Sequence, residues 1–84
     1  MLCALSSLQT GKKGRVKALE MTSNQARELK RLGLTTGTGL QCLRRCPFGG
    51  PGIYQLRGTV LALRRVDARK IRVFVPDSAD RKRD

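Results

Sequence analysis

The sequence contains no histidine and no tryptophan, and its aromatic side chains are one tyrosine and two phenylalanines. Acidic residues are also scarce, because only 6 aspartates and glutamates stand against 18 lysines and arginines. Outside the C-terminal tail the acids are Glu20, Glu28 and Asp67, which lie far apart in the chain. The residues therefore offer no general acid–base pair and no phosphate-binding glycine loop. We expect a protein that is not an enzyme and that has no cofactor and no small-molecule substrate.

Long apolar runs are absent too. No segment approaches the roughly 20 apolar residues that a membrane-spanning helix requires. The first eight residues lack the basic and apolar regions of a signal peptide. We therefore expect a cytoplasmic protein, in which any association with a membrane depends on a partner.

The cysteines do not form a metal-binding pattern. Cys3, Cys42 and Cys46 make an odd number, which does not suit a disulfide framework in a protein without a secretion signal. Cys42 and Cys46 are four residues apart, and on one strand that separation corresponds to about 13 Å, too far to share an ion. A structural zinc site also needs four cysteine or histidine ligands. We expect free, reduced thiols and no metal site.

With 84 residues the chain is a single small domain, and its core must be compact and mainly aliphatic. Residues 1–76 carry the apolar pattern of a folded domain. Residues 77–84 are charged and have no apolar anchor, so we expect a disordered tail there.

One helix is predicted after Thr22. Thr22 and Gln25 have the spacing of a capping box, and Ala26, Leu29 and Leu32 repeat at intervals of three to form an apolar stripe. Gly33 follows, and glycine readily adopts the positive φ that commonly ends a helix.

Five strands are predicted from alternating or short apolar runs. They cover residues 14–20, 40–45, 53–57, 60–64 and 71–75. The helix stands between the first and second of these strands, and residues 65–69 form one helical turn. A mainly β fold follows: a small, bent, five-stranded antiparallel barrel with one short helix.

The loop between the second and third predicted strands reads Pro47-Phe48-Gly49-Gly50-Pro51. Two interpretations remain open at this point. In the first, the glycines serve the backbone of a tight corner and nothing more. In the second, Phe48 is a rigid, exposed aromatic that anchors a partner, at little entropic cost because the corner is preorganised.

The motifs above form one ordered pattern between Leu5 and Val75. Its residues are Leu32, Gly33, Leu34, Gly37, Pro47, Gly49, Gly50, Pro51, Gly58, Leu61, Ala62, Leu63, Arg64, Ile71 and Val73. In these residues and their order the chain resembles the FeoA family, small bacterial proteins of ferrous iron uptake. This resemblance implies an SH3-like barrel that acts as a cytoplasmic accessory protein. The implied partner is the membrane or GTP-binding part of the FeoB iron transporter.

Under this interpretation the candidate partner-binding residues are Phe48, Gly49, Gly50, Pro51, Arg57, Arg64 and Phe74. Two alternatives share the fold. One is a regulatory interaction module, similar to the C-terminal domain of metal-dependent repressors. The other is a basic barrel that binds RNA. The net charge of +12 also predicts weak, salt-sensitive binding to polyanions without sequence preference.

Overall fold

A computed structural model describes residues 1–76. The tail of residues 77–84, for which the sequence predicts disorder, lies outside the described residues. In chain order the elements are β1 (Leu2–Ala4), the 3₁₀ turn η1 (Leu5–Ser7), β2 (Lys13–Leu19), α1 (Ser23–Arg31), β3 (Gly39–Arg45), β4 (Gly52–Leu56), β5 (Thr59–Leu63), α2 (Arg65–Ala68) and β6 (Ile71–Phe74).

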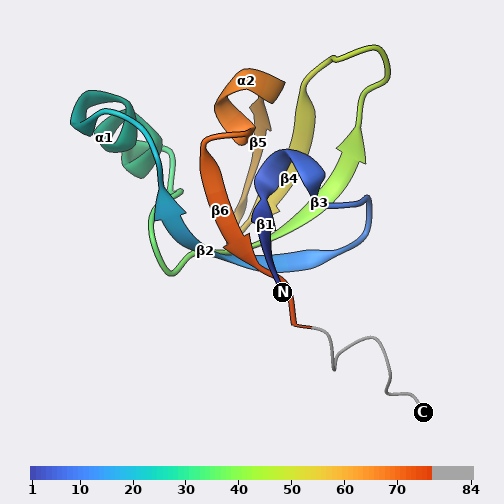
Figure 1. The fold of residues 1–84 in the computed structure, drawn as a ribbon, viewed down its shortest axis with the longest axis horizontal. Coiled ribbons are helices and arrows are strands. Elements are labelled where there is room, and N and C mark those ends of the chain that lie inside the picture. Colours follow the sequence, from blue (N-terminus) through green and yellow to red (C-terminus); the bar gives the residue numbers. More distant parts are fainter. Residues whose placement is uncertain (77–84) are drawn as a thin grey trace.

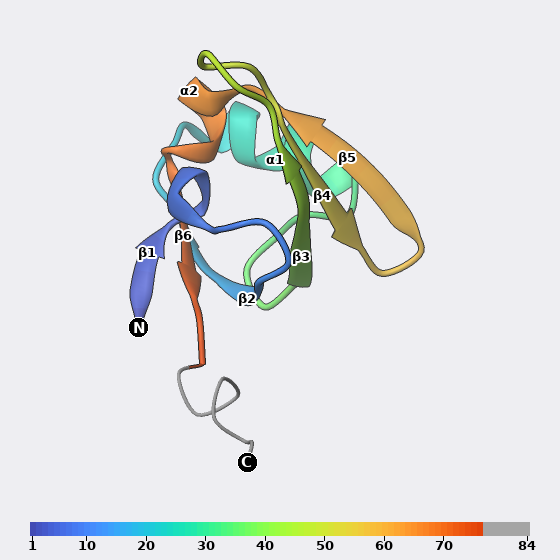
Figure 2. The ribbon, with the colours of Figure 1, turned by 90° about the vertical axis from the view of Figure 1, so that its right-hand side faces the viewer.

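The strands form one antiparallel sheet in the order β1-β6-β2-β3-β4-β5. The sheet bends strongly, and α1, α2 and the loop between β3 and β4 all lie toward one end of the molecule (Figure 1). In the view turned by 90°, β1 and β6 lie on one side and β4 and β5 on the other, with β2 and β3 between them (Figure 2). The predicted mainly β, barrel-like fold with one main helix is confirmed.

The described residues form six strands, one more than the sequence predicts. The additional strand is β1, which pairs with β6 so that Cys3 lies opposite Val73. Backbone hydrogen bonds extend the pairing: the Met1 amino group donates to the Val75 carbonyl at 2.9 Å, and the Val75 amide donates to the Met1 carbonyl at 2.7 Å. A strand of three residues is too short to show an alternating pattern, which is why the sequence gives no signal for it.

Two strands alternate imperfectly in sequence because each contains a bulge. The pairing register shifts between Val16 and Ala18 in β2 and between Cys42 and Arg44 in β3. A bulge inserts one unpaired residue and so moves the following side chains to the other face. For this reason Val16 and Leu19, three positions apart, both contact the core.

Helix α1 begins as predicted. The Thr22 hydroxyl accepts a hydrogen bond from the Gln25 amide at 3.2 Å, and the Gln25 side chain accepts one from the Thr22 amide at 3.3 Å. Gly33, with φ 98°, follows the helix end. Leu29 is buried, whereas Leu32, the C-cap residue, is exposed.

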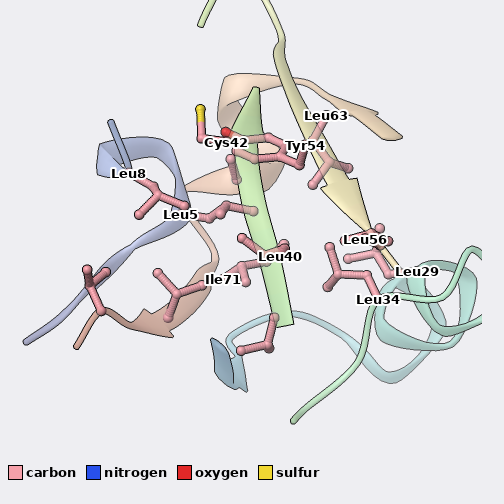
Figure 3. Packing of buried hydrophobic residues seen from close by; sticks show 14 residues of the cluster. Leu5, Leu8, Leu29, Leu34, Leu40, Cys42, Tyr54, Leu56, Leu63 and Ile71 are labelled. Carbon is pink, nitrogen blue, oxygen red and sulfur yellow. The ribbon is translucent and has the colours of Figure 1, made fainter. Parts of the chain in front are cut away.

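The core lies between the bent sheet, α1, η1 and α2 (Figure 3). Its six largest fully buried side chains are Leu5, Leu34, Ile71, Val16, Val73 and Cys42. In the described residues no polar or charged side chain is buried. None of the helices in residues 1–76 has the length and apolar character needed to cross a membrane.

Candidate functional site

The loop between β3 and β4, residues 46–51, is here called the corner, and its backbone is a tight turn. The Gly50 amide donates to the Pro47 carbonyl at 3.2 Å, and between them Phe48 and Gly49 have φ of 59° and 77°. Positive φ at both central residues is the pattern of a type I′ turn. At the base, the Cys46 amide donates to the Pro51 carbonyl at 3.2 Å. The corner is therefore a closed, hydrogen-bonded hairpin turn.

Phe48 occupies the tip of this turn and contacts almost nothing. Its relative exposure is 103%, so it contributes no packing to the fold. Among the described residues other than glycine, Phe48 alone has a positive φ. That conformation costs an ordinary L-residue about 1–2 kcal/mol, and strain of this kind clusters at binding sites. The predicted exposure of Phe48 is confirmed, whereas its role in partner binding stays a prediction.

The two corner glycines are needed for different reasons. Gly49 supplies positive φ, and a side chain there would meet open space. Gly50, by contrast, does not have a positive φ. Gly50 is required by space, because a Cβ atom there would lie 2.9 Å from the Cβ of Cys46 and 3.3 Å from the Pro47 carbonyl oxygen. Pro51 is exposed and accepts the hydrogen bond that closes the corner.

A small hollow lies between the corner and α2. Arg45, Cys46 and Gly50 line this hollow together with Arg65 of α2 and Tyr54 of β4. Burial raises the pKa of the Tyr54 hydroxyl, so this group stays neutral at physiological pH. The hollow beneath the corner is thus lined by a buried, uncharged tyrosine.

The thiols near the corner do not assemble a ligand set. Cys42 is fully buried, and burial raises the pKa of its thiol, which keeps it protonated and unreactive at neutral pH. Cys46 is half-buried and free. Within residues 1–76, no three side chains of histidine, cysteine, aspartate or glutamate lie together as a metal-binding group.

Arg64 stands apart from the corner residues. It is the N-cap residue of α2, and its Nε atom lies 3.2 Å from the Asp67 Oδ2 atom. The arginine is exposed, so this short-range ion pair is worth little to stability. Arg64 and Asp67 line a small hollow against α1, together with Leu29 and Glu28. Arg64 is therefore available to solvent but is already partly neutralised.

Arg57 and Phe74 lie at the other end of the β3–β4 hairpin. They line a groove of about 560 Å³, here called the sheet groove, formed by β2, β3, β4 and β6. Phe74 is 43% exposed, and Arg57 is exposed, so the outward orientation predicted from strand alternation is confirmed for both. The structure thus divides the predicted site residues among the corner, which holds residues 48–51, the isolated Arg64, and the sheet groove.

Among the groove residues that sequence reasoning missed are two cationic ones, Lys13 and Arg15. Arg15 lies opposite Phe74 on one side and opposite Gly39 on the other. Its Nη1 atom donates to the Gly37 carbonyl at 2.7 Å, which holds the guanidinium over the turn before β3. Alternation along β2 would have placed Arg15 outward, but only the pairing register brings it next to Phe74.

Comparison with known proteins identifies the domain. The sequence profile of the FeoA domain matches residues 3–74. A crystal structure of an iron uptake regulatory protein (FeoA) is 31% identical over 88% of this chain and 96% of that one, with a TM-score of 0.78. The solution structure of a FeoA protein from Chlorobium tepidum is 33% identical over 86% of this chain and 69% of that one, with a TM-score of 0.79. Curated protein sequences contain no match.

A more distant likeness concerns the fold alone. A manganese-dependent transcriptional repressor is 21% identical over 89% of this chain and 42% of the repressor, with a TM-score of 0.80. The SH3-like fold implied by the sequence resemblance is therefore confirmed. On the profile match and the solved relatives, this chain belongs to the FeoA family.

Proposed function

We propose that this chain is a cytoplasmic accessory protein of ferrous iron uptake that docks, through its corner, on the cytoplasmic part of a FeoB-type transporter. FeoA proteins are a family of small iron-transport accessory domains and not a family of enzymes. The side-chain chemistry of the described residues supports a non-catalytic role. The three side-chain carboxylates within residues 1–76, those of Glu20, Glu28 and Asp67, each form an ion pair with an arginine. The sequence has no histidine.

The observation that carries the proposal is the conformation of Phe48. Because the Phe48 ring is fully exposed, the fold gains none of the free energy that burial of the ring would contribute. The positive φ of Phe48 adds backbone strain. Neither cost brings any contact within the folded domain. Both are offset if the ring is buried against a partner.

The energetics of such an anchor are favourable. Burying a phenylalanine ring contributes about 1.5–3 kcal/mol, and affinity at protein interfaces concentrates in a few aromatic or arginine side chains. The corner is closed by two backbone hydrogen bonds, so the backbone that carries Phe48 has little remaining freedom. A preorganised anchor of this kind loses little conformational entropy on binding.

The test is a titration of the purified cytoplasmic part of a FeoB-type transporter with the wild-type chain and with Phe48→Asn. Asparagine tolerates positive φ and suits a type I′ turn before glycine, so this variant removes the ring and keeps the corner. We expect binding to weaken about thirtyfold, the equivalent of roughly 2 kcal/mol for one buried aromatic ring. Iron uptake by cells that carry the variant should fall in parallel.

Phe48→Tyr is the matched control, because it keeps an aromatic ring at the same backbone position. It should bind within a few-fold of wild type. Wild-type affinity for folded Phe48→Asn would show that the corner is only architecture and would overturn docking through Phe48.

A further inference from the structure

The sheet groove lies at the opposite end of the β3–β4 hairpin from the corner. The strand register places Gln41 of β3 opposite Gln55 of β4 at the groove, and Arg45 opposite Gly52 at the corner. Among residues 1–76, the groove and the hollow beneath the corner share no lining residue. It is a separate surface, to which the proposed docking of Phe48 assigns no role.

The shape of the groove follows from one missing side chain. Phe74, Arg15 and Gly39 are neighbours across β6, β2 and β3. They alternate with the buried residues Val73, Val16 and Leu40, so this row faces away from the core. Since Gly39 has no side chain, a depression opens between Arg15 and the outward side chains of β4. Phe74 and Pro76 form its apolar wall, and its floor reaches Leu40 and Leu56.

The polar rim of the groove is cationic. Lys13, Arg15 and Arg57 line it, and among residues 1–76 no acidic residue does. The three carboxylates of the described residues lie elsewhere, each paired with an arginine outside the groove. Neither Lys13 nor Arg57 has an ion pair or hydrogen bond to another described side chain. These positive charges are therefore uncompensated by residues 1–76.

A second hollow of about 490 Å³ continues from the first, and the two share Arg15, Gly39, Leu56 and Arg57. Its lining is more polar and includes the hydroxyl residues Thr36, Thr38 and Thr59. The two arginines thus stand between an apolar hollow and a hydrogen-bonding one. Arginine binds carboxylates strongly, because its planar guanidinium donates two parallel hydrogen bonds to the two oxygens.

We propose that the sheet groove binds an acidic polypeptide segment of a partner protein that carries one large apolar side chain. The apolar side chain enters the hollow beside Phe74 and Pro76. Neighbouring carboxylates bind Arg15 and Arg57, and the threonine-lined hollow receives the polar backbone that follows. Nucleic acid fits less well, because one phenylalanine ring gives no stacking platform and a duplex cannot enter a hollow of this size.

The test uses the full chain and a short fluorescent peptide in which one leucine stands between aspartates, measured by fluorescence anisotropy. Two matched peptides replace either the leucine with serine or the aspartates with asparagine. We expect the first peptide to bind, and both replacements to weaken binding about tenfold or more, as the loss of a buried apolar side chain or of a charged hydrogen bond predicts.

Variants then locate the site. Arg57→Gln should weaken binding of the leucine–aspartate peptide about tenfold, which corresponds to the loss of one charged hydrogen bond. Arg27→Gln removes the same charge from the exposed face of α1 and should change binding by less than about twofold, because separated surface charges are screened by salt. Phe74→Thr keeps a strand-forming residue while it removes the apolar wall, and should also weaken binding. Circular dichroism checks that each variant is folded.

Equal losses for Arg57→Gln and Arg27→Gln would overturn the proposal in favour of diffuse charge attraction. Equal binding of the serine peptide would show that the apolar hollow is not used, and would also overturn it. A DNA duplex that competes in an Arg57-dependent way, more strongly than the peptide does, would reassign the groove to nucleic acid. The Phe48→Asn variant should bind the peptide normally, so failure of this proposal and failure of docking through the corner are distinguishable.

Discussion

Replacement of Phe48 by asparagine should stabilise the folded domain while it removes the proposed anchor. The wild-type backbone holds Phe48 at φ 59°, in the left-handed region. This conformation costs an ordinary L-residue about 1–2 kcal/mol, whereas asparagine enters it more readily because its short polar side chain can hydrogen-bond locally. The relative exposure of Phe48 is 103%, so no packing is lost with the ring. We expect the free energy of unfolding to rise by about 1 kcal/mol.

The measurement is thermal unfolding followed by circular dichroism, with urea unfolding as a second determination. For a domain of this size, 1 kcal/mol corresponds to an increase in Tm of about 4–8 °C. Phe48→Tyr keeps a bulky aromatic residue at positive φ and should leave the Tm near that of wild type. A lower Tm for Phe48→Asn would refute the reasoning, because it would mean that the ring stabilises the fold through contacts that the structure does not contain.

The same substitution separates stability from binding. If Phe48 served only the turn, its replacement would not weaken binding to the partner while the fold stays intact. If Phe48 is an anchor, Phe48→Asn should raise the free energy of unfolding and at the same time weaken binding. A rise in stability together with a loss of affinity indicates that Phe48 serves binding to a partner at the expense of stability. Loss of both would instead indicate a disturbed corner.

Three further predictions concern the corner glycines, the buried thiol and the net charge. Gly50→Val should destabilise the domain by about 1–3 kcal/mol in urea unfolding, because its Cβ atom would lie 2.9 Å from that of Cys46; Gly49→Ala, with positive φ but open space, should cost only about 1 kcal/mol. Burial raises the pKa of the Cys42 thiol above the ordinary thiol value of 9.0. The stability that the protonated thiol contributes should therefore be complete below pH 9.0 and should decline as the pH rises above that value. In Cys42→Ala this decline in the free energy of unfolding should be smaller. An unchanged pH profile in Cys42→Ala would contradict this. Retention on heparin should fall steeply with salt and should show no preference among DNA sequences in competition, since the net charge of +12 acts through released counterions.

The fold could be predicted from sequence wherever a local physical rule operates. The capping box at Thr22, the helix stop at Gly33 and the period-two pattern of β6 all depend on residues close together in the chain. Strand β1 could not be predicted, because three residues acquire strand geometry only by pairing with β6 at the other end of the chain. The bulges in β2 and β3 likewise became visible only as register shifts against their partners.

The site was predictable only in part, for the same reason. The exposure of Phe48 follows from the prolines and glycines around it, which are local. The glycines were expected to serve the backbone of the corner, whereas at Gly50 the structure shows a requirement for space, because a Cβ atom there would lie 2.9 Å from the Cβ of Cys46. Arg57 and Phe74 were predicted as separate outward residues. Their common groove, with Arg15 between them, exists only because β6, β2, β3 and β4 are neighbours in the sheet.

The positions of the corner and the sheet groove make the two proposals independently testable. The seven residues of β3 separate them, and a strand of that length spans roughly 20 Å. Effects of substitutions on stability are usually additive beyond about 10 Å when the sites share no partner. The double variant Phe48→Asn, Arg57→Gln should therefore show the sum of the two single changes in unfolding free energy. We expect Phe48→Asn to weaken only binding of the transporter and Arg57→Gln to weaken only binding of the acidic peptide, so that one hairpin presents two uncoupled recognition surfaces.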